Sequence, residues 1–98
     1  MKRFDVEILP DAEAEIRAAF LWYFDRSPLA ADAFRTEVFE AIDGLEDTAD
    51  MWAPDEDGVR RYFLSRFPYT VHYELDETRA VVFAVGHQRR KPRYWEDH

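Results

Sequence analysis

The 98-residue sequence is 47% hydrophobic and 35% charged, with a formal net charge of −8, which fits one folded domain spanning residues 1–98 and excludes a disordered chain. It contains no cysteine, which excludes a disulfide framework and a cysteine-ligated metal site. No apolar run approaches the roughly 20 residues of a membrane span and the N-terminal residues lack the apolar stretch of a signal peptide, so we expect a cytoplasmic protein without membrane contact.

The chain begins with a predicted strand and helix. Residues 4–9 alternate apolar and acidic side chains, as in a strand with one buried face. Pro10 ends this strand, and Asp11 is the expected N-cap of a helix from about Ala12 to Asp25. We interpret the carboxylates Glu13 and Glu15 in its first turn as solvated charge that complements the helix dipole.

A second helix is predicted to follow almost at once. Ser27 is its expected N-cap and Pro28 its first residue. Because only two or three residues link the helices, they should form an antiparallel hairpin. Residues 47–58 are expected to form an acidic loop, pinned to the body by Met51 and Trp52. The buried stripe of this helix is expected to be Phe34, Val38, Ala41, Ile42 and Leu45.

From Val59 onward the periodicity is that of strands. We expect strands over residues 59–67, 69–75 and 80–86, with a hairpin turn at 76–79. The predicted fold is therefore α+β: an N-terminal strand, an α-helical hairpin, then a three-strand antiparallel meander with the first strand at one of its edges. The expected core residues are Phe20, Phe34, Val38, Ile42, Val71, Tyr73, Val81 and Phe83.

Charge is divided unevenly along the chain. Residues 1–58 hold five Lys/Arg against sixteen Asp/Glu, whereas residues 59–98 hold eight against five. The acidic half repels phosphates, so general nucleic-acid binding is not expected, although a basic patch can act at short range. The basic residues gather after the last predicted strand, next to two aromatic residues, and indicate a contact surface: Arg89, Arg90, Lys91, Arg93, Tyr94 and Trp95.

Three arginines near the first meander strand are further candidates. Strand alternation should send Arg60 and Arg66 to one face and Arg61 to the other. Each could bind partner carboxylates, or could simply pair with the acidic helices. His87, at a strand end, is a candidate acid or base or a structural hydrogen-bonding group, whereas His72 is expected to be a packed or surface residue of the sheet.

The end of the first helix, around Trp22, is apolar nearly all round. Either the loop near Met51 and Trp52 covers the surplus, or it forms partner surface. No cluster of residues has metal-ligand spacing, and no cofactor is expected.

The element order resembles that of the RelE/ParE superfamily of toxins, particularly its ParE-like, plasmid-stabilisation branch. The resemblance covers essentially the whole chain and rests on R-R-Y-F-L-S-R-F-P-Y-T-V-H-Y from Arg60 and on V-G-H-Q-R-R-K-P-R-Y-W from Val85. It implies a toxin neutralised by a cognate antitoxin protein, in a possible hetero-oligomer. ParE members are understood to poison DNA gyrase, and RelE members to cut messenger RNA on the ribosome.

Two functions compete under this resemblance. A gyrase inhibitor acts by binding alone, whereas a metal-independent endoribonuclease would use Arg61, His87 and Tyr94. The resemblance implies that members of the RNA-cutting branch are strongly basic proteins. This chain instead has only two lysines and an acidic loop at residues 55–57. We therefore expect a ParE-like inhibitor. A toxin-like fold without toxicity is a third possibility.

Overall fold

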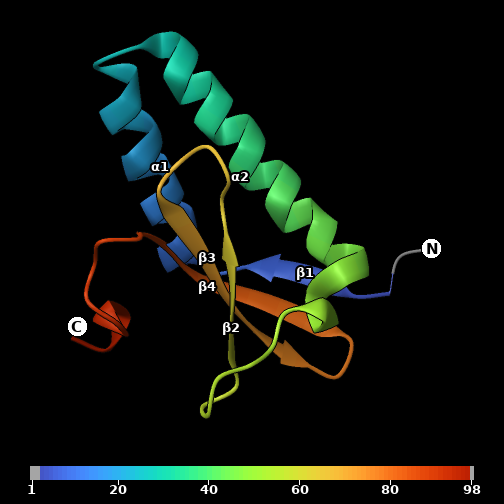
Figure 1. Ribbon diagram of the computed structural model, residues 1–98. Coiled ribbons are helices and arrows are strands. Elements are labelled where there is room, and N and C mark those ends of the chain that lie inside the picture. Colours follow the sequence, from blue (N-terminus) through green and yellow to red (C-terminus); the bar gives the residue numbers. More distant parts are fainter. Residues whose placement is uncertain (1–2, 98) are drawn as a thin grey trace.

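A computed structural model describes residues 3–97 and confirms the predicted α+β architecture (Figure 1). A single sheet has the order β1–β4–β3–β2. β1 pairs in parallel with β4 at one edge, and the other neighbours are antiparallel. The first strand thus joins an edge of the meander, as expected. The strands are β1 (Asp5–Ile8), β2 (Val59–Phe63), β3 (Tyr69–Asp76) and β4 (Arg79–His87).

Two helices, α1 (Pro10–Phe24) and α2 (Pro28–Thr48), form an antiparallel hairpin over one face of the sheet (Figure 1). α2 begins as predicted, because the Ser27 hydroxyl accepts a hydrogen bond from the Ala30 amide at 3.2 Å. The predicted Asp11 cap of α1 is wrong. Leu9 is the N-cap and Pro10 the first helical residue, because proline has the φ angle that a helix start requires and needs no hydrogen bond for its nitrogen.

The expected acidic loop begins later than residue 47. α2 continues to Thr48, and a 3₁₀ turn follows at Ala49–Met51. Leu45 and Ala49, four residues apart, are both buried, so the apolar stripe of the helix continues beyond the predicted end. Met51 is 66% exposed and does not pin the loop, whereas Trp52 packs against Tyr62.

β2 is shorter than the predicted strand over 59–67. The chain turns sharply after Phe63, where the Leu64 amide donates to the Tyr69 carbonyl at 3.0 Å. Arg66 therefore lies outside the strand, and its predicted place on one strand face with Arg60 is wrong. Its amide instead donates to the Glu37 carboxylate of α2.

A β-bulge in β4 changes which residues enter the core. His72 pairs with Ala84 and Tyr73 with Val82, so Phe83 is the extra residue. Val82 and Val85 consequently both join the core under the helices, while Phe83 packs beside Trp95 on the opposite face. The predicted core placement of Val81 and Phe83 is wrong, and Phe20 is only partly buried. The predicted core residues Phe34, Val38, Ile42, Val71 and Tyr73 are confirmed.

Candidate functional site

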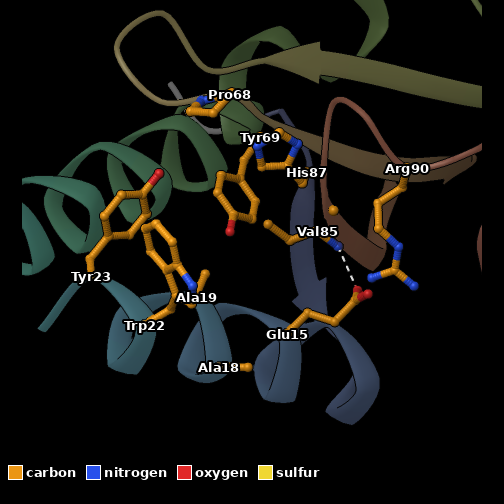
Figure 2. Close-up of a pocket in the computed structure, with 11 residues that line it drawn as sticks. Glu15, Ala18, Ala19, Trp22, Tyr23, Pro68, Tyr69, Val85, His87 and Arg90 are labelled. Atoms are coloured by element: carbon orange, nitrogen blue, oxygen red, sulfur yellow. Dashed lines mark hydrogen bonds between the residues drawn. The ribbon is translucent and has the colours of Figure 1, made fainter. Parts of the chain in front are cut away.

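A cleft of about 540 Å³ lies between α1 and the end of β4 (Figure 2). Trp22 and Tyr23 of α1 form one side, and Tyr69 of β3 and His87 of β4 form the other. Arg90, just beyond β4, completes one end. The cleft thus brings together three predicted site residues, Trp22, His87 and Arg90, from distant parts of the sequence.

Glu15 lies at the same end of the cleft as Arg90 and joins α1 to β4 (Figure 2). One carboxylate oxygen accepts from the Val85 amide at 2.8 Å, and the other accepts from the Tyr94 hydroxyl at 2.7 Å. Its expected role as solvated charge is wrong, because the carboxylate replaces a strand partner that β4 lacks at this point. Sequence analysis missed this residue, although Glu15, Ala19 and Trp22 have the spacing of one helical face.

Tyr94 is buried, and its ring packs directly on Gly86. A Cβ at Gly86 would lie 2.6 Å from Cζ of Tyr94, so only glycine allows the ring this position. Burial, together with the hydrogen bond to Glu15, raises the pKa of the Tyr94 hydroxyl well above its usual value. The hydroxyl is therefore a fixed structural donor at neutral pH.

The C-terminal tail, defined here as residues 88–97, covers part of the sheet face that the helices leave open (Figure 1). Arg93 holds it to the loop before β2 through Asp55 at 3.4 Å and Asp57 at 3.3 Å. Asp55 also pairs with Arg61 of β2 at 3.1 Å. Within the molecule, the acidic loop is thus paired with Arg93 of the tail and with Arg61 of β2.

A second hollow, of about 210 Å³, lies beneath this tail. Arg61, His87 and Tyr94 all line it, so the three residues of the ribonuclease hypothesis do gather at one place. The Arg61 guanidinium is engaged by Asp55, however, and the Tyr94 hydroxyl by Glu15. His87 accepts a hydrogen bond at Nδ1 from the Arg89 amide at 3.0 Å, which is the structural role considered for it.

His72 lies beneath Trp95 of the tail, with ring centroids 4.5 Å apart. Only 8% of His72 is exposed, and its Nδ1 atom has no hydrogen-bond partner in the described structure. Burial lowers the pKa of His72 to about 4, and the nearby Arg61 acts in the same direction. His72 is thus a packed, neutral sheet residue, as expected.

The remaining predicted arginines differ in their surroundings. Arg60 donates to the Trp52 carbonyl at 2.6 Å, and Arg66 lies 3.7 Å from the Glu37 carboxylate. Arg89 and Arg90 are exposed in the turn after β4, and the Arg90 guanidinium lies over the Tyr94 ring at 3.9 Å from its centroid. The latter two arginines therefore remain accessible to a partner.

The tip of the helical hairpin carries exposed apolar side chains. Leu21, Trp22 and Phe24 of α1 are 54%, 51% and 48% exposed, and Leu29 of α2 is 82% exposed. The alternative that Met51 and Trp52 cover this surface is wrong, because the hairpin is antiparallel and they lie at its opposite end (Figure 1). Neither helix in the described part of the chain is long and apolar enough to span a bilayer.

Comparison with known proteins identifies the family. A sequence profile described as "ParE toxin of type II toxin-antitoxin system, parDE" matches residues 6–92. The chain belongs to the ParE toxin family. A solved structure entitled "Chromosomal ParDE TA system from P. aeruginosa" has the same fold as this ParE-family chain, with a TM-score of 0.77 and 19% sequence identity. The similarity covers 87% of this chain and 96% of that one. A search of curated proteins finds no match.

For this ParE-family toxin, the profile match spans both the cleft and the greater part of the turn after β4. The match ends at residue 92, before Arg93, Tyr94 and Trp95. The contacts of these last residues with Asp55, Glu15 and His72 are therefore known from the structure alone.

Proposed function

We propose that this ParE-family toxin inhibits DNA gyrase by binding, without catalysing a reaction, and that a cognate antitoxin protein neutralises it in a hetero-oligomeric complex. Membership of the family supports the toxin and the antitoxin partner. Gyrase as the target rests on the resemblance to the ParE-like branch and on the engagement of Arg61 and Tyr94, argued next.

The observation that carries this proposal is the engagement of the polar groups beneath the tail. A ribonuclease needs a cation free to bind the phosphate and an acid or base free to exchange a proton. Here Asp55 occupies Arg61 and Glu15 occupies the Tyr94 hydroxyl, whose pKa is raised. Binding alone makes no such demand, since it requires an exposed surface rather than reactive groups.

The ribonuclease alternative keeps one supporting observation, because Arg61, His87 and Tyr94 line the same hollow. The two functions give opposite results in two assays. Purified protein should block supercoiling by gyrase or trap cleaved DNA, and translating ribosomes should leave their messenger RNA intact. Messenger cleavage lost in both His87→Ala and Arg61→Ala, without any effect on gyrase, would replace the proposal by the alternative.

For the antitoxin, we propose a binding surface that extends from Trp22 to the turn at Arg89 and Arg90. In this proposal the other predicted residues act indirectly, because each already has a hydrogen bond, ion pair or ring contact within the molecule. They are Arg60, Arg61, Arg66, Arg93, Tyr94 and Trp95. The exposed Trp22 side chain is suited to anchor a partner, and such residues lose about 2 kcal/mol of binding free energy on truncation.

Calorimetric titration with the product of the adjacent gene tests this surface. We expect Trp22→Ala to weaken binding roughly 30-fold, since 1.4 kcal/mol corresponds to a factor of ten. Met51→Ala is the matched control, because Met51 is also exposed but lies at the opposite end of the hairpin. Equal affinities for the wild-type protein and Trp22→Ala would place the antitoxin on another surface.

A further inference from the structure

The outer edge of β2 is a free edge of the sheet. The strand order β1–β4–β3–β2 leaves β2 at the end, where it pairs with β3 alone among the described residues (Figure 1). The edge is closed at its start, because the Val59 amide donates to the Asp55 carboxylate at 3.0 Å and the Val59 carbonyl accepts from the Asp55 amide at 2.9 Å. It is open beyond Val59 as far as Phe63, where the strand ends.

Alternation along β2 shows which main-chain groups are open at this edge. The Leu64 amide donates to the Tyr69 carbonyl, toward β3, whereas the amide and carbonyl of Val59 bind the loop before the strand. In an antiparallel pair, every second residue directs both its amide and its carbonyl to the same side. Arg61 and Phe63 must therefore direct these groups away from β3, where residues 3–97 supply no hydrogen bond to any of the four.

A second copy of β2 matches this pattern. If a two-fold axis passes beside Tyr62, the two strands run antiparallel, and Arg61 of each copy lies opposite Phe63 of the other. These two residue pairs exchange four main-chain hydrogen bonds, so all the open groups of both edges are used. Arg61 and Phe63 both line the hollow beneath the tail, which places their side chains on the same face of the sheet. Each guanidinium then lies beside a phenyl ring, which is a favourable cross-strand pair.

The neighbouring symmetric registers are less favourable. An axis beside Arg61 would place two arginines directly opposite each other, and like charges in this position destabilise a sheet. It would also need the main-chain groups of Val59, which the loop before β2 already occupies. An axis beside Phe63 would need Ser65, whose amide donates to the Glu37 carboxylate at 2.7 Å in the turn after β2. The edge is therefore self-complementary in one register.

Exposure and charge also favour a second copy. Phe63 is 62% exposed, a feature that natural edge strands avoid unless a partner covers it. Antiparallel pairing brings the start of each β2 beside the end of the other. The start follows the acidic residues 55–57, and the end precedes Arg66, whose side chain is 64% exposed, so opposite charges meet at both ends. The net charge of −8 opposes association, but salt at about 0.15 M screens exposed charges that lie more than about 8 Å apart.

We propose that two copies of the protein associate through the outer edges of β2 and form one continuous sheet. The partner is a second copy of this chain, whose β2 supplies the strand that the edge lacks. The inference goes beyond the proposed function and does not depend on gyrase as the target. β3 lies between this edge and β4, so the cleft beside α1 stays open in both copies of the dimer.

The register is tested with introduced cysteines, since the chain has none of its own. Full-length Arg61→Cys and Phe63→Cys proteins are oxidised separately and as an equimolar mixture. Residues opposite each other in a hydrogen-bonded pair have Cα atoms about 5.5 Å apart, within the range that a disulfide spans. We expect the mixture to form linked dimers about tenfold faster than either protein alone, because the pairing holds the two thiols at a high effective concentration. Equal rates, or faster linkage of either protein to itself, would overturn the inference.

Sedimentation velocity over a range of protein concentrations measures the association itself. The wild-type protein should show a monomer–dimer equilibrium. Phe63→Pro removes the outward amide, which the pairing with β3 does not use, and should abolish the dimer while the circular dichroism spectrum stays unchanged. Phe63→Lys places a lysine opposite Arg61 at two symmetric positions and should weaken the dimer about tenfold.

Phe39→Lys is the matched control, because it makes the same change in a groove lined by α1 and α2 residues, and it should dimerise like the wild-type protein. A wild-type protein that stayed monomeric at millimolar concentration would overturn the inference. Unchanged dimerisation of Phe63→Lys would also overturn it, because the copies would then meet through another surface. Either result would leave the proposed function untouched, since inhibition of gyrase is measured separately.

Discussion

The hydrogen bond between Tyr94 and Glu15 gives the sharpest test of how the tail is held. The substitution Tyr94→Phe removes the hydroxyl and keeps the ring that packs on Gly86. A hydrogen bond to a charged acceptor contributes about 1.5–3 kcal/mol to stability. Because Glu15 is partly exposed and water can replace the lost donor, we expect the lower end of this range, about 1.5 kcal/mol.

Chemical denaturation measures this loss, and thermal unfolding should show a fall in midpoint of roughly 6–12 °C for a domain of this size. A double-mutant cycle separates the hydrogen bond from other effects. Glu15→Ala also uncovers the Val85 amide, so it should cost more than Tyr94→Phe alone. If the loss of stability in the double mutant equalled the sum of the two single losses to within about 0.3 kcal/mol, the side chains would not be coupled. The structural reasoning about the tail would then be refuted.

Three further predictions follow from the same part of the molecule. Because burial lowers the pKa of His72 to about 4 from 6.5, the unfolded chain binds a proton that the folded chain does not between these pH values. Stability present above pH 6.5 is therefore lost as the pH falls through this window. The fall in unfolding free energy between pH 7 and pH 4, measured by denaturant titration, should be smaller by about 3 kcal/mol in His72→Gln than in the wild-type protein. Equal falls in the two proteins would mean that His72 is not buried. Gly86→Ala should displace the Tyr94 ring and lower stability by about 1–3 kcal/mol, whereas Gly44→Ala, which meets no atom within 4 Å in α2, should raise it by about 0.5–1 kcal/mol; near-ultraviolet circular dichroism should change in the first alone. Phe34→Ala should cost about 3–5 kcal/mol because the ring is fully buried, and Phe83→Ala should cost clearly less because its ring is partly exposed beside Trp95; similar unfolding midpoints for both variants would contradict the bulge.

The parts of the fold that the sequence predicted are those governed by local rules. The cap at Ser27 and the stripe through Phe34, Val38 and Ile42 depend on residues a few positions apart, and all are observed. The bulge at Phe83 was missed because period-two alternation predicts an uninterrupted strand. A bulge depends on how the strand pairs with its neighbour in the sheet, and the local sequence pattern does not specify that pairing.

The same reason explains the residues missed in the candidate site. Glu15 lies in the first part of a helix, where a solvated carboxylate is expected. The Val85 amide is available to it only because β1 ends before this part of β4. Basic residues in the last part of the chain were predicted as contact surface. Arg89 and Arg90 are exposed, as such a surface requires, and their contact with a partner stays a prediction. Arg93 instead forms ion pairs within the molecule, which the sequence did not predict because Asp55 and Asp57 lie almost forty residues away.

The packing of the tail also decides how truncated forms of the protein should be interpreted. A chain ending before Arg93 would lack Tyr94 and Trp95, so His72, Phe83 and the surface of Gly86 would lose their cover. Such a chain would present new apolar area to solvent and would be prone to aggregation. Loss of toxicity on truncation would therefore be ambiguous, whereas point substitutions at Arg89 and Arg90 would change the accessible charge and leave that cover in place.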